Sequence, residues 1–168
     1  RDTRSSKPNP LDEVKSLIFY LDILYRNVYD DLISDPDIIK GSSNFNISFG
    51  SWVGADKDGN PFVTTEITLH VAKRLRHTVL INYFRDLRKL KRRLTFELVK
   101  EPIAALEQKV YKEITFPSAK RPPFKLKPFK EELLRIRGIL ISEYNSLFLE
   151  ELDDLINKVN LFGMHFAT

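Results

Sequence analysis

The residues best suited to chemistry lie together between Phe49 and Pro61. This run reads F-G-S-W-V-G-A-D-K-D-G-N-P and holds the only tryptophan and three of the six glycines of the chain. Glycine and proline fix a backbone path that few other residues could follow. Asp56, Lys57 and Asp58 place three formal charges on that path. Because binding and catalytic residues often occupy loops of fixed shape, the run predicts a functional loop.

The D-K-D-G-N-P part of the run also invites a calcium interpretation. Asp56, Asp58 and Asn60 occupy the first, third and fifth positions of an EF-hand loop. The sixth position requires glycine but holds Pro61, and the twelfth requires glutamate but holds Ile67. The pattern therefore disfavours calcium. The plain structural alternative is that the aspartates bind loop amides and basic neighbours.

Composition bounds the class of protein. The chain has 168 residues, 42% hydrophobic and 30% charged, with a net charge of +4 and no cysteine. These values are typical of a globular domain with a core. The absence of cysteine excludes disulfides and thiolate metal sites. No apolar run approaches the roughly 20 residues that cross a bilayer, and no secretory signal is present. We expect a cytoplasmic location and no membrane partner.

Two elements are predicted before the functional loop. Apolar residues at spacings of three and four predict a helix over 10–34, which the dipeptide Asp35-Pro36 should end. The predicted apolar stripe of this helix comprises Leu17, Leu21, Leu24, Val28 and Leu32. Alternation of apolar and polar residues then predicts a short strand over 45–51, leading into a motif loop over 52–64.

The remainder of the chain is predicted to be mostly helical. Thr64 or Thr65 can cap a long helix over 65–96. Its apolar stripe comprises Ile67, Val71, Leu75, Val79, Tyr83, Leu87, Leu90 and Leu94. The later elements are a helix over 97–113, a proline-rich loop over 115–128, helices within 130–159 and a strand over 163–168 that would bury His165. The fold class is therefore mainly α, with long helices and two short strands.

Basic residues crowd the long helix and suggest a rival function. The segment 73–93 carries ten arginine, lysine and histidine side chains, with Tyr83 and Phe84 among them. Such a face is compatible with a helical module that binds nucleic acid or protein. A solvated helix face is the simpler interpretation, because the charges alternate with a strong apolar stripe. His70, His77 and His165 do not have the spacing of a metal site.

The run from Ser51 to Pro61 resembles the S-W-M-G-G-D-R-D-G-N-P motif of phosphoenolpyruvate carboxylase. Flanking segments extend the resemblance along the chain. Asp2-Thr3-Arg4 and Lys7–Glu13 resemble the family's D-E-I-R-R-x-x-P-T-P-x-D-E, and Val63–Thr68 is similar to N-V-T-P-E-V-T. The end, Val159–Thr168, resembles the segment that leads into L-D-I-R-Q.

The resemblance implies an activity and an architecture. The family joins bicarbonate to phosphoenolpyruvate to give oxaloacetate and phosphate, a carbon-fixing reaction that replenishes the tricarboxylic acid cycle. The chain would then be one internal fragment, 1–168, of a helix-wrapped α/β barrel. Its partners would be the two substrates, the remainder of the same polypeptide and, as a homo-oligomer, further copies. The intact enzyme would need Mg²⁺ or Mn²⁺; this fragment is expected to bind no metal, to bind no nucleic acid and to be inactive alone.

The resemblance also implies roles for residues. Trp52 would form an apolar wall near the carbon dioxide intermediate, with an ordinary core position as the alternative, and Lys57 would take the place of the family arginine. The substrate-binding loop would comprise Gly54, Asp56, Asp58 and Asn60. Arg4 matches an arginine of a phosphate-binding activator region, with a plain exposed terminal side chain as the alternative.

Two residues depart from the family motif. Ala55 replaces the second glycine and adds a methyl group that opposes a positive φ. Lys57 replaces the arginine and keeps the charge, but it loses the planar fork that binds a carboxylate or phosphate with two hydrogen bonds. If the arginine only supplies charge, Lys57 can substitute for it; if it makes a bidentate contact, that contact should weaken.

Overall fold

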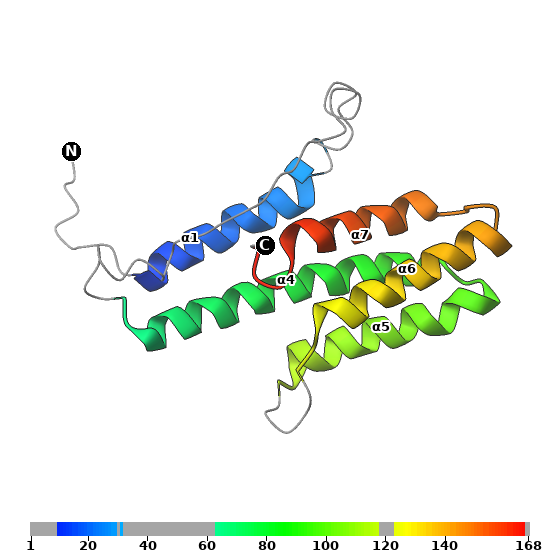
Figure 1. Ribbon diagram of the computed structural model, residues 1–168. Coiled ribbons are helices and arrows are strands. Elements are labelled where there is room, and N and C mark those ends of the chain that lie inside the picture. Colours follow the sequence, from blue (N-terminus) through cyan, green and yellow to red (C-terminus); the bar gives the residue numbers. More distant parts are fainter. Residues whose placement is uncertain (1–9, 30, 32–62, 118–122, 167–168) are drawn as a thin grey trace.

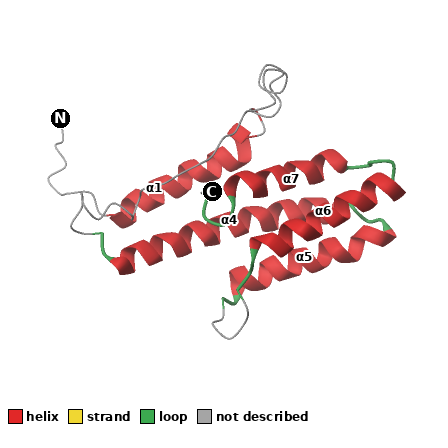
Figure 2. Ribbon diagram, in the orientation of Figure 1, coloured by secondary structure: helices red, strands yellow, loops and turns green. Residues whose placement is uncertain are grey.

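This computed structural model describes residues 10–29, 31, 63–117 and 123–166. All of the helices and strands assigned in these ranges are helices. Figure 2 shows these elements. They are α1 (Pro10–Ile23), the π-helical turn η1 (Leu24–Val28), α4 (Thr65–Arg93), α5 (Glu97–Thr115), α6 (Leu126–Glu143) and α7 (Leu149–Phe162). The mainly helical class is confirmed. The strand predicted over 45–51 and most of the motif loop lie outside the described residues.

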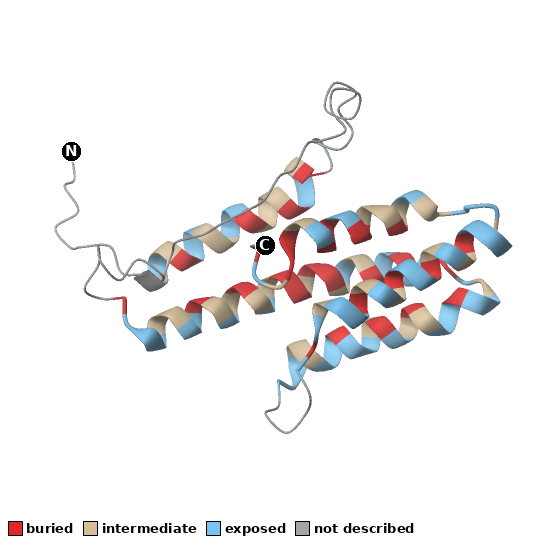
Figure 3. Cartoon of the chain, in the orientation of Figure 1, coloured by how far each residue is buried: buried red, intermediate tan, exposed pale blue. Residues whose placement is uncertain are grey.

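Four helices form an antiparallel bundle. In Figure 1, α4, α5, α6 and α7 lie side by side and alternate in direction, as the short connection between α4 and α5 requires. Each helix contacts the next, and α7 returns to contact α4, so the ring of four closes. Helix α1 packs outside this ring against α4. The buried residues of these helices form one hydrophobic core, and Figure 3 marks their positions along the helices in red.

The long helix α4 is built on the apolar stripe that its sequence predicts. Val71, Leu75, Val79, Tyr83, Leu87 and Leu90 are all buried, and Ile67 packs at the edge of the core. The helix begins at Thr65 because Thr64 caps it, and it ends at Arg93, three residues before the predicted end. At about 1.5 Å per residue it is roughly 43 Å long. It contacts α1, α5 and α7 and is therefore the central helix of the fold.

The first helix departs from its predicted register. The segment Leu24–Val28 is π-helical, which turns the following residues relative to an uninterrupted α-helix. Tyr25 and Tyr29 consequently become the buried residues, exposed by only 2% and 6%, whereas Leu24 and Val28 of the predicted stripe are half-buried. The aromatic rings enter the core because Phe162 of α7 lies against both of them, with ring centroids 5.1 and 6.2 Å away.

Two other boundaries differ from the prediction, and the position of Pro128 accounts for one of them. Helix α6 begins at Leu126, inside the predicted 115–128 loop, and Pro128 lies in its first turn. That turn tolerates proline, since its N–H groups have no partner within the helix. Helix α5 contains Pro102 and runs to Thr115, two residues beyond the predicted end.

The strand predicted over 163–168 is wrong for its described part. Gly163 is a single bridge residue and Met164 to Phe166 form a turn, so no strand follows α7 in the described residues. Gly163 has φ 54° and ψ −130°, a conformation that opposes a continuing strand and favours glycine. His165, expected to pack within a strand, is exposed on this turn. Phe166 instead becomes the buried residue, 1% exposed.

Candidate functional site

The functional loop predicted from the sequence lies outside the described residues. This applies to Trp52 and Lys57, whose catalytic roles therefore stay predictions. It applies equally to Gly54, Asp56, Asp58 and Asn60, predicted to bind substrate, and to Arg4, predicted to bind an activator phosphate. The structure describes the elements on either side of this loop.

The described chain resumes at Val63 and leads directly into α4. Val63, two residues after Pro61, is buried with 9% of its surface exposed. Thr64 caps the helix: its Oγ1 accepts a hydrogen bond of 3.3 Å from the Ile67 N–H, and its carbonyl oxygen accepts one from the Thr68 hydroxyl at 3.1 Å. The sequence predicted a cap at Thr64 or Thr65, and the structure assigns it to Thr64. A cap of this kind stabilises a helix start by about 1 kcal/mol.

The helix before the motif and the helix after it are joined by polar contacts. The Tyr25 hydroxyl donates a hydrogen bond of 2.8 Å to Asp86, and the Asn82 side-chain amide donates one of 3.0 Å to Asp22. Asn82 is itself buried, 1% exposed. These bonds join residues about 60 positions apart in sequence. They hold α1 and α4 in one relative position.

An aromatic cluster joins the C-terminal turn to the same two helices. Tyr83 is fully buried, and its hydroxyl donates a hydrogen bond of 2.6 Å to the carbonyl oxygen of Gly163. Burial raises the pKa of the Tyr83 hydroxyl, which therefore stays protonated and can donate. The ammonium group of Lys158 lies 5.3 Å from the ring centroids of both Tyr25 and Tyr29. Such cation–π contacts strengthen where water is excluded.

Acidic partners neutralise much of the basic face of α4. Arg76 pairs with Glu113 at 2.8 Å, Lys91 with Glu107 at 2.6 Å and Lys89 with Asp86 at 3.3 Å. Arg85 lies 3.7 Å from Asp22, Arg88 lies 3.9 Å from Glu107, and Arg93 pairs with Glu151. Side chains already paired with carboxylates offer little to nucleic acid phosphates. These pairs are typical of a solvated helix face, and the alternative of a nucleic-acid- or protein-binding face over 73–93 stays a prediction.

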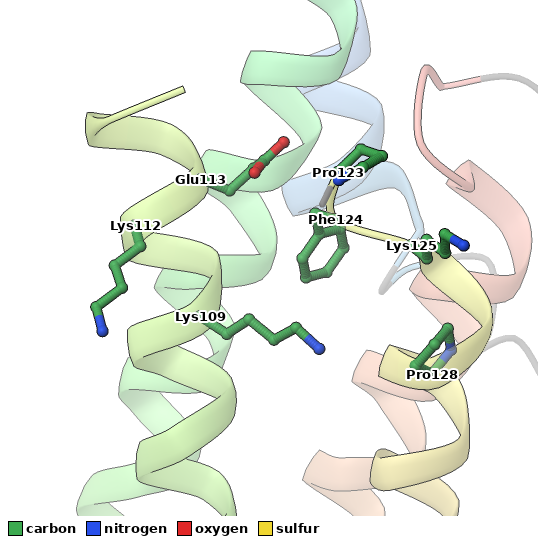
Figure 4. Close-up of a pocket in the computed structure, with 7 residues that line it drawn as sticks. All are labelled: Lys109, Lys112, Glu113, Pro123, Phe124, Lys125 and Pro128. Atoms are coloured by element: carbon green, nitrogen blue, oxygen red, sulfur yellow. The ribbon is translucent and has the colours of Figure 1, made fainter. Parts of the chain in front are cut away.

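Two cavities lie near the Arg76–Glu113 pair. One, of about 440 Å³, lies between the ends of α5 and α6, with Lys109, Lys112 and Phe124 among its lining residues. Figure 4 shows Lys109 extending toward α6 while Lys112 points away from it. The other, of about 540 Å³, runs along α4 between Ile18 of α1 and Pro117 beyond α5. His70 and His77 both line this second groove, which the sequence alone did not reveal.

Metal and membrane features are absent from the part of the chain that the structure describes. No group of three histidine, aspartate or glutamate side chains there lies close enough to hold a metal ion. Within the same ranges, no helix combines the length and the apolar character that spanning a bilayer requires.

Comparisons with known proteins agree with the motif. A sequence model of the phosphoenolpyruvate carboxylase family matches residues 1–122 of the chain. The chain belongs to the phosphoenolpyruvate carboxylase family. The phosphoenolpyruvate carboxylase of Synechococcus sp. (strain WH7803) is 32% identical over 141 residues, which cover 76% of this chain and 14% of that protein. The one from Parasynechococcus marenigrum (strain WH8102) is 31% identical over 231 residues, covering 96% of this chain and 23% of that protein.

The chain is thus only a part of the length of its family members, between about a seventh and a quarter of the two relatives. A third relative, from Shewanella loihica, is 45% identical over 60 residues, 36% of this chain and 7% of that protein. No solved structure matches the chain.

Proposed function

We propose that this chain is a segment of a phosphoenolpyruvate carboxylase, which converts phosphoenolpyruvate and bicarbonate into oxaloacetate and phosphate. The observation that carries the proposal is the family match over residues 1–122, which includes the whole S-W-V-G-A-D-K-D-G-N-P motif. In the proposed reaction the phosphoryl group passes from phosphoenolpyruvate to bicarbonate. The carboxyphosphate that results breaks down to carbon dioxide and phosphate, and the enolate attacks the carbon dioxide.

Trp52 would keep water from this intermediate. Carbon dioxide released beside an enolate must react before it escapes and before water protonates the enolate. An indole ring supplies a large apolar wall and one N–H group that can be oriented by a partner. Trp52 is the only tryptophan of the chain, and it lies nine positions before Pro61. After the loop, Val63 is buried and Thr64 caps the start of α4.

The polar residues of the loop would bind and orient substrate. Asp56, Asp58 and Asn60 supply acceptors and an amide, and Gly54 lets the backbone approach closely. Lys57 would supply positive charge to a phosphate or carboxylate oxygen, as a point charge without a bidentate fork. Arg4 would contribute to an activator phosphate site.

The metal that the family implies has no ligand set among the described residues. Mg²⁺ or Mn²⁺ would neutralise phosphate and enolate oxygens in the intact enzyme. Since the described histidine, aspartate and glutamate side chains form no cluster that fits such an ion, we assign it no ligand here. The intact enzyme would be a cytoplasmic homo-oligomer.

A comparison of two polypeptides tests the proposal. The isolated 168-residue chain and the full-length polypeptide that contains it are each supplied with phosphoenolpyruvate, bicarbonate and Mg²⁺. We expect oxaloacetate and phosphate from the full-length protein and none above background from the isolated chain, which covers 14% to 23% of two related enzymes. Turnover by the isolated chain would contradict its proposed inactivity. A full-length protein that gave no oxaloacetate would contradict the function itself.

The role of Trp52 is tested by product partition in the full-length protein. Trp52→Ala should raise the share of phosphoenolpyruvate that is hydrolysed to pyruvate, because water then reaches the enolate. Trp52→Phe is the matched control, since it keeps an apolar ring. We expect the ratio of pyruvate to oxaloacetate to rise severalfold in the alanine variant and little in the phenylalanine variant. An unchanged ratio in Trp52→Ala would leave Trp52 as an ordinary packing residue.

A further inference from the structure

The basic residues of α4 fall into two groups that differ in their partners. One group forms ion pairs with carboxylates of α1, α4, α5 or α7. It comprises Arg76, Arg85, Arg88, Lys89, Lys91 and Arg93. In the N-terminal part of the helix, His70, Lys73, Arg74 and His77 make no ion pair with any described residue. An unneutralised set of basic side chains therefore stands apart from the paired ones.

These four side chains share one face of α4. Apart from the adjacent Lys73 and Arg74, their positions differ by three, four or seven residues, the spacings that place helix residues above one another. All four line the groove of about 540 Å³ that runs between α1 and the end of α5. Arg74 is half-buried in this groove, whereas His70, Lys73 and His77 are exposed.

The other walls of the groove are apolar or electrically neutralised. Ile18 of α1, Leu80 of α4 and Pro117 contribute apolar surface. Glu113 is the only acidic residue of the lining that the structure describes. Its carboxylate is 2.8 Å from Arg76, which also donates a hydrogen bond of 3.1 Å to the carbonyl oxygen of Phe124. This acid is therefore engaged by Arg76 and does not cancel the charges of Lys73 and Arg74.

We propose that this groove binds a small organic anion, a compound with a phosphate or carboxylate group attached to an apolar body. Lys73 and Arg74 would supply charge-assisted hydrogen bonds, and the ring N–H groups of His70 and His77 would add donors. The volume lies within the range of small-molecule sites, which combine apolar walls with a few polar groups. The site differs from the motif loop at residues 51–61 and does not rest on the proposed carboxylase function.

The cavity of about 440 Å³ between α5 and α6 does not fit such a ligand as well. Two of its three lysines diverge, because Lys109 extends toward α6 while Lys112 points away (Figure 4). Divergent ammonium groups cannot converge on one anionic group. The groove along α4 is distinguished by four basic side chains that rise from a single helix face.

Histidine signals give a direct test in the 168-residue chain. The chain has only three histidines, and two of them line the groove. The ring signals of His70 and His77 would be followed by NMR as phenyl phosphate is added, with benzoate, inorganic phosphate and benzyl alcohol as separate probes. We expect saturable shifts with phenyl phosphate or benzoate, weaker binding of inorganic phosphate and no saturable response to benzyl alcohol. The stronger of the first two identifies the anionic group.

Paired charge variants separate this groove from general electrostatic attraction. Removal of two groove charges in Lys73→Ala/Arg74→Ala should weaken binding about tenfold, equivalent to about 1.4 kcal/mol. Removal of two charges elsewhere, in Arg92→Ala/Lys100→Ala, should change the dissociation constant less than twofold. Equal weakening in both variants, equal binding of benzyl alcohol, or no saturable shift with either anion would overturn the proposal. The proposal would also be overturned if a single-stranded oligonucleotide bound more tightly than either anion and both variants weakened its binding equally.

Discussion

The buried hydrogen bond between Tyr83 and Gly163 offers a clean perturbation of the fold. Tyr83→Phe deletes one hydroxyl oxygen and keeps the ring. The ring contacts with Tyr25 and Phe129, whose centroids lie 6.0 and 5.9 Å away, should therefore persist. The substitution leaves the carbonyl oxygen of Gly163 without the 2.6 Å bond that the hydroxyl donates to it.

The expected cost follows from the burial of both partners. Tyr83 is 0% exposed and Gly163 is buried, so water cannot readily replace the lost hydroxyl. A buried polar group left without its partner costs about 1–3 kcal/mol. With a urea dependence of about 2 kcal/mol per molar, a loss of about 2 kcal/mol lowers the unfolding midpoint by about 1 M.

Urea unfolding of the 168-residue chain, followed by far-ultraviolet circular dichroism, measures this change. Tyr20→Phe is the matched control, because that side chain is 63% exposed and its variant should stay within about 0.5 kcal/mol of the parent. The slope of the transition should be the same in all three proteins. If Tyr83→Phe unfolds at the same urea concentration as Tyr20→Phe, the Tyr83–Gly163 bond does not hold the C-terminal turn as we argue.

Two further predictions concern backbone conformation and pH. Gly163→Ala should destabilise the chain by about 1–3 kcal/mol, because φ is 54° at this residue. Gly138→Ala should instead stabilise it by about 0.5–1 kcal/mol, since an added Cβ meets nothing within 4 Å inside α6. If the two glycine substitutions shift the urea midpoint in the same direction, these two predictions are refuted. His165 has a pKa below its ordinary value of 6.5, first through desolvation and then through Arg76. Protonation therefore favours the unfolded chain, and stability should fall as the pH drops through 6.5. His165→Asn should reduce that fall in thermal unfolding between pH 7 and pH 5, and an unaltered slope would contradict the assignment.

Local sequence was sufficient for much of the helical framework. The apolar stripe of α4 and the cap at Thr64 follow from side-chain spacing and from one hydroxyl, both of which act within a few residues. Family membership was likewise predictable from the run between Ser51 and Pro61. The roles of Trp52 and Lys57 within that run stay predictions, because these residues lie outside the described structure.

Tertiary structure decided what depends on partners distant in the chain. After Leu21, helical spacing allowed either Leu24 and Val28 or Tyr25 and Tyr29 to face the core. The π-helical turn and the approach of Phe162 select the two tyrosines. The positive charges of α4 looked equivalent in sequence. Only the packing of helices shows that Arg76 has a carboxylate from 37 residues away, while Arg74 faces an open groove. Periodicity fixes which side of a helix is apolar, whereas the neighbours of each charged side chain depend on how whole helices pack.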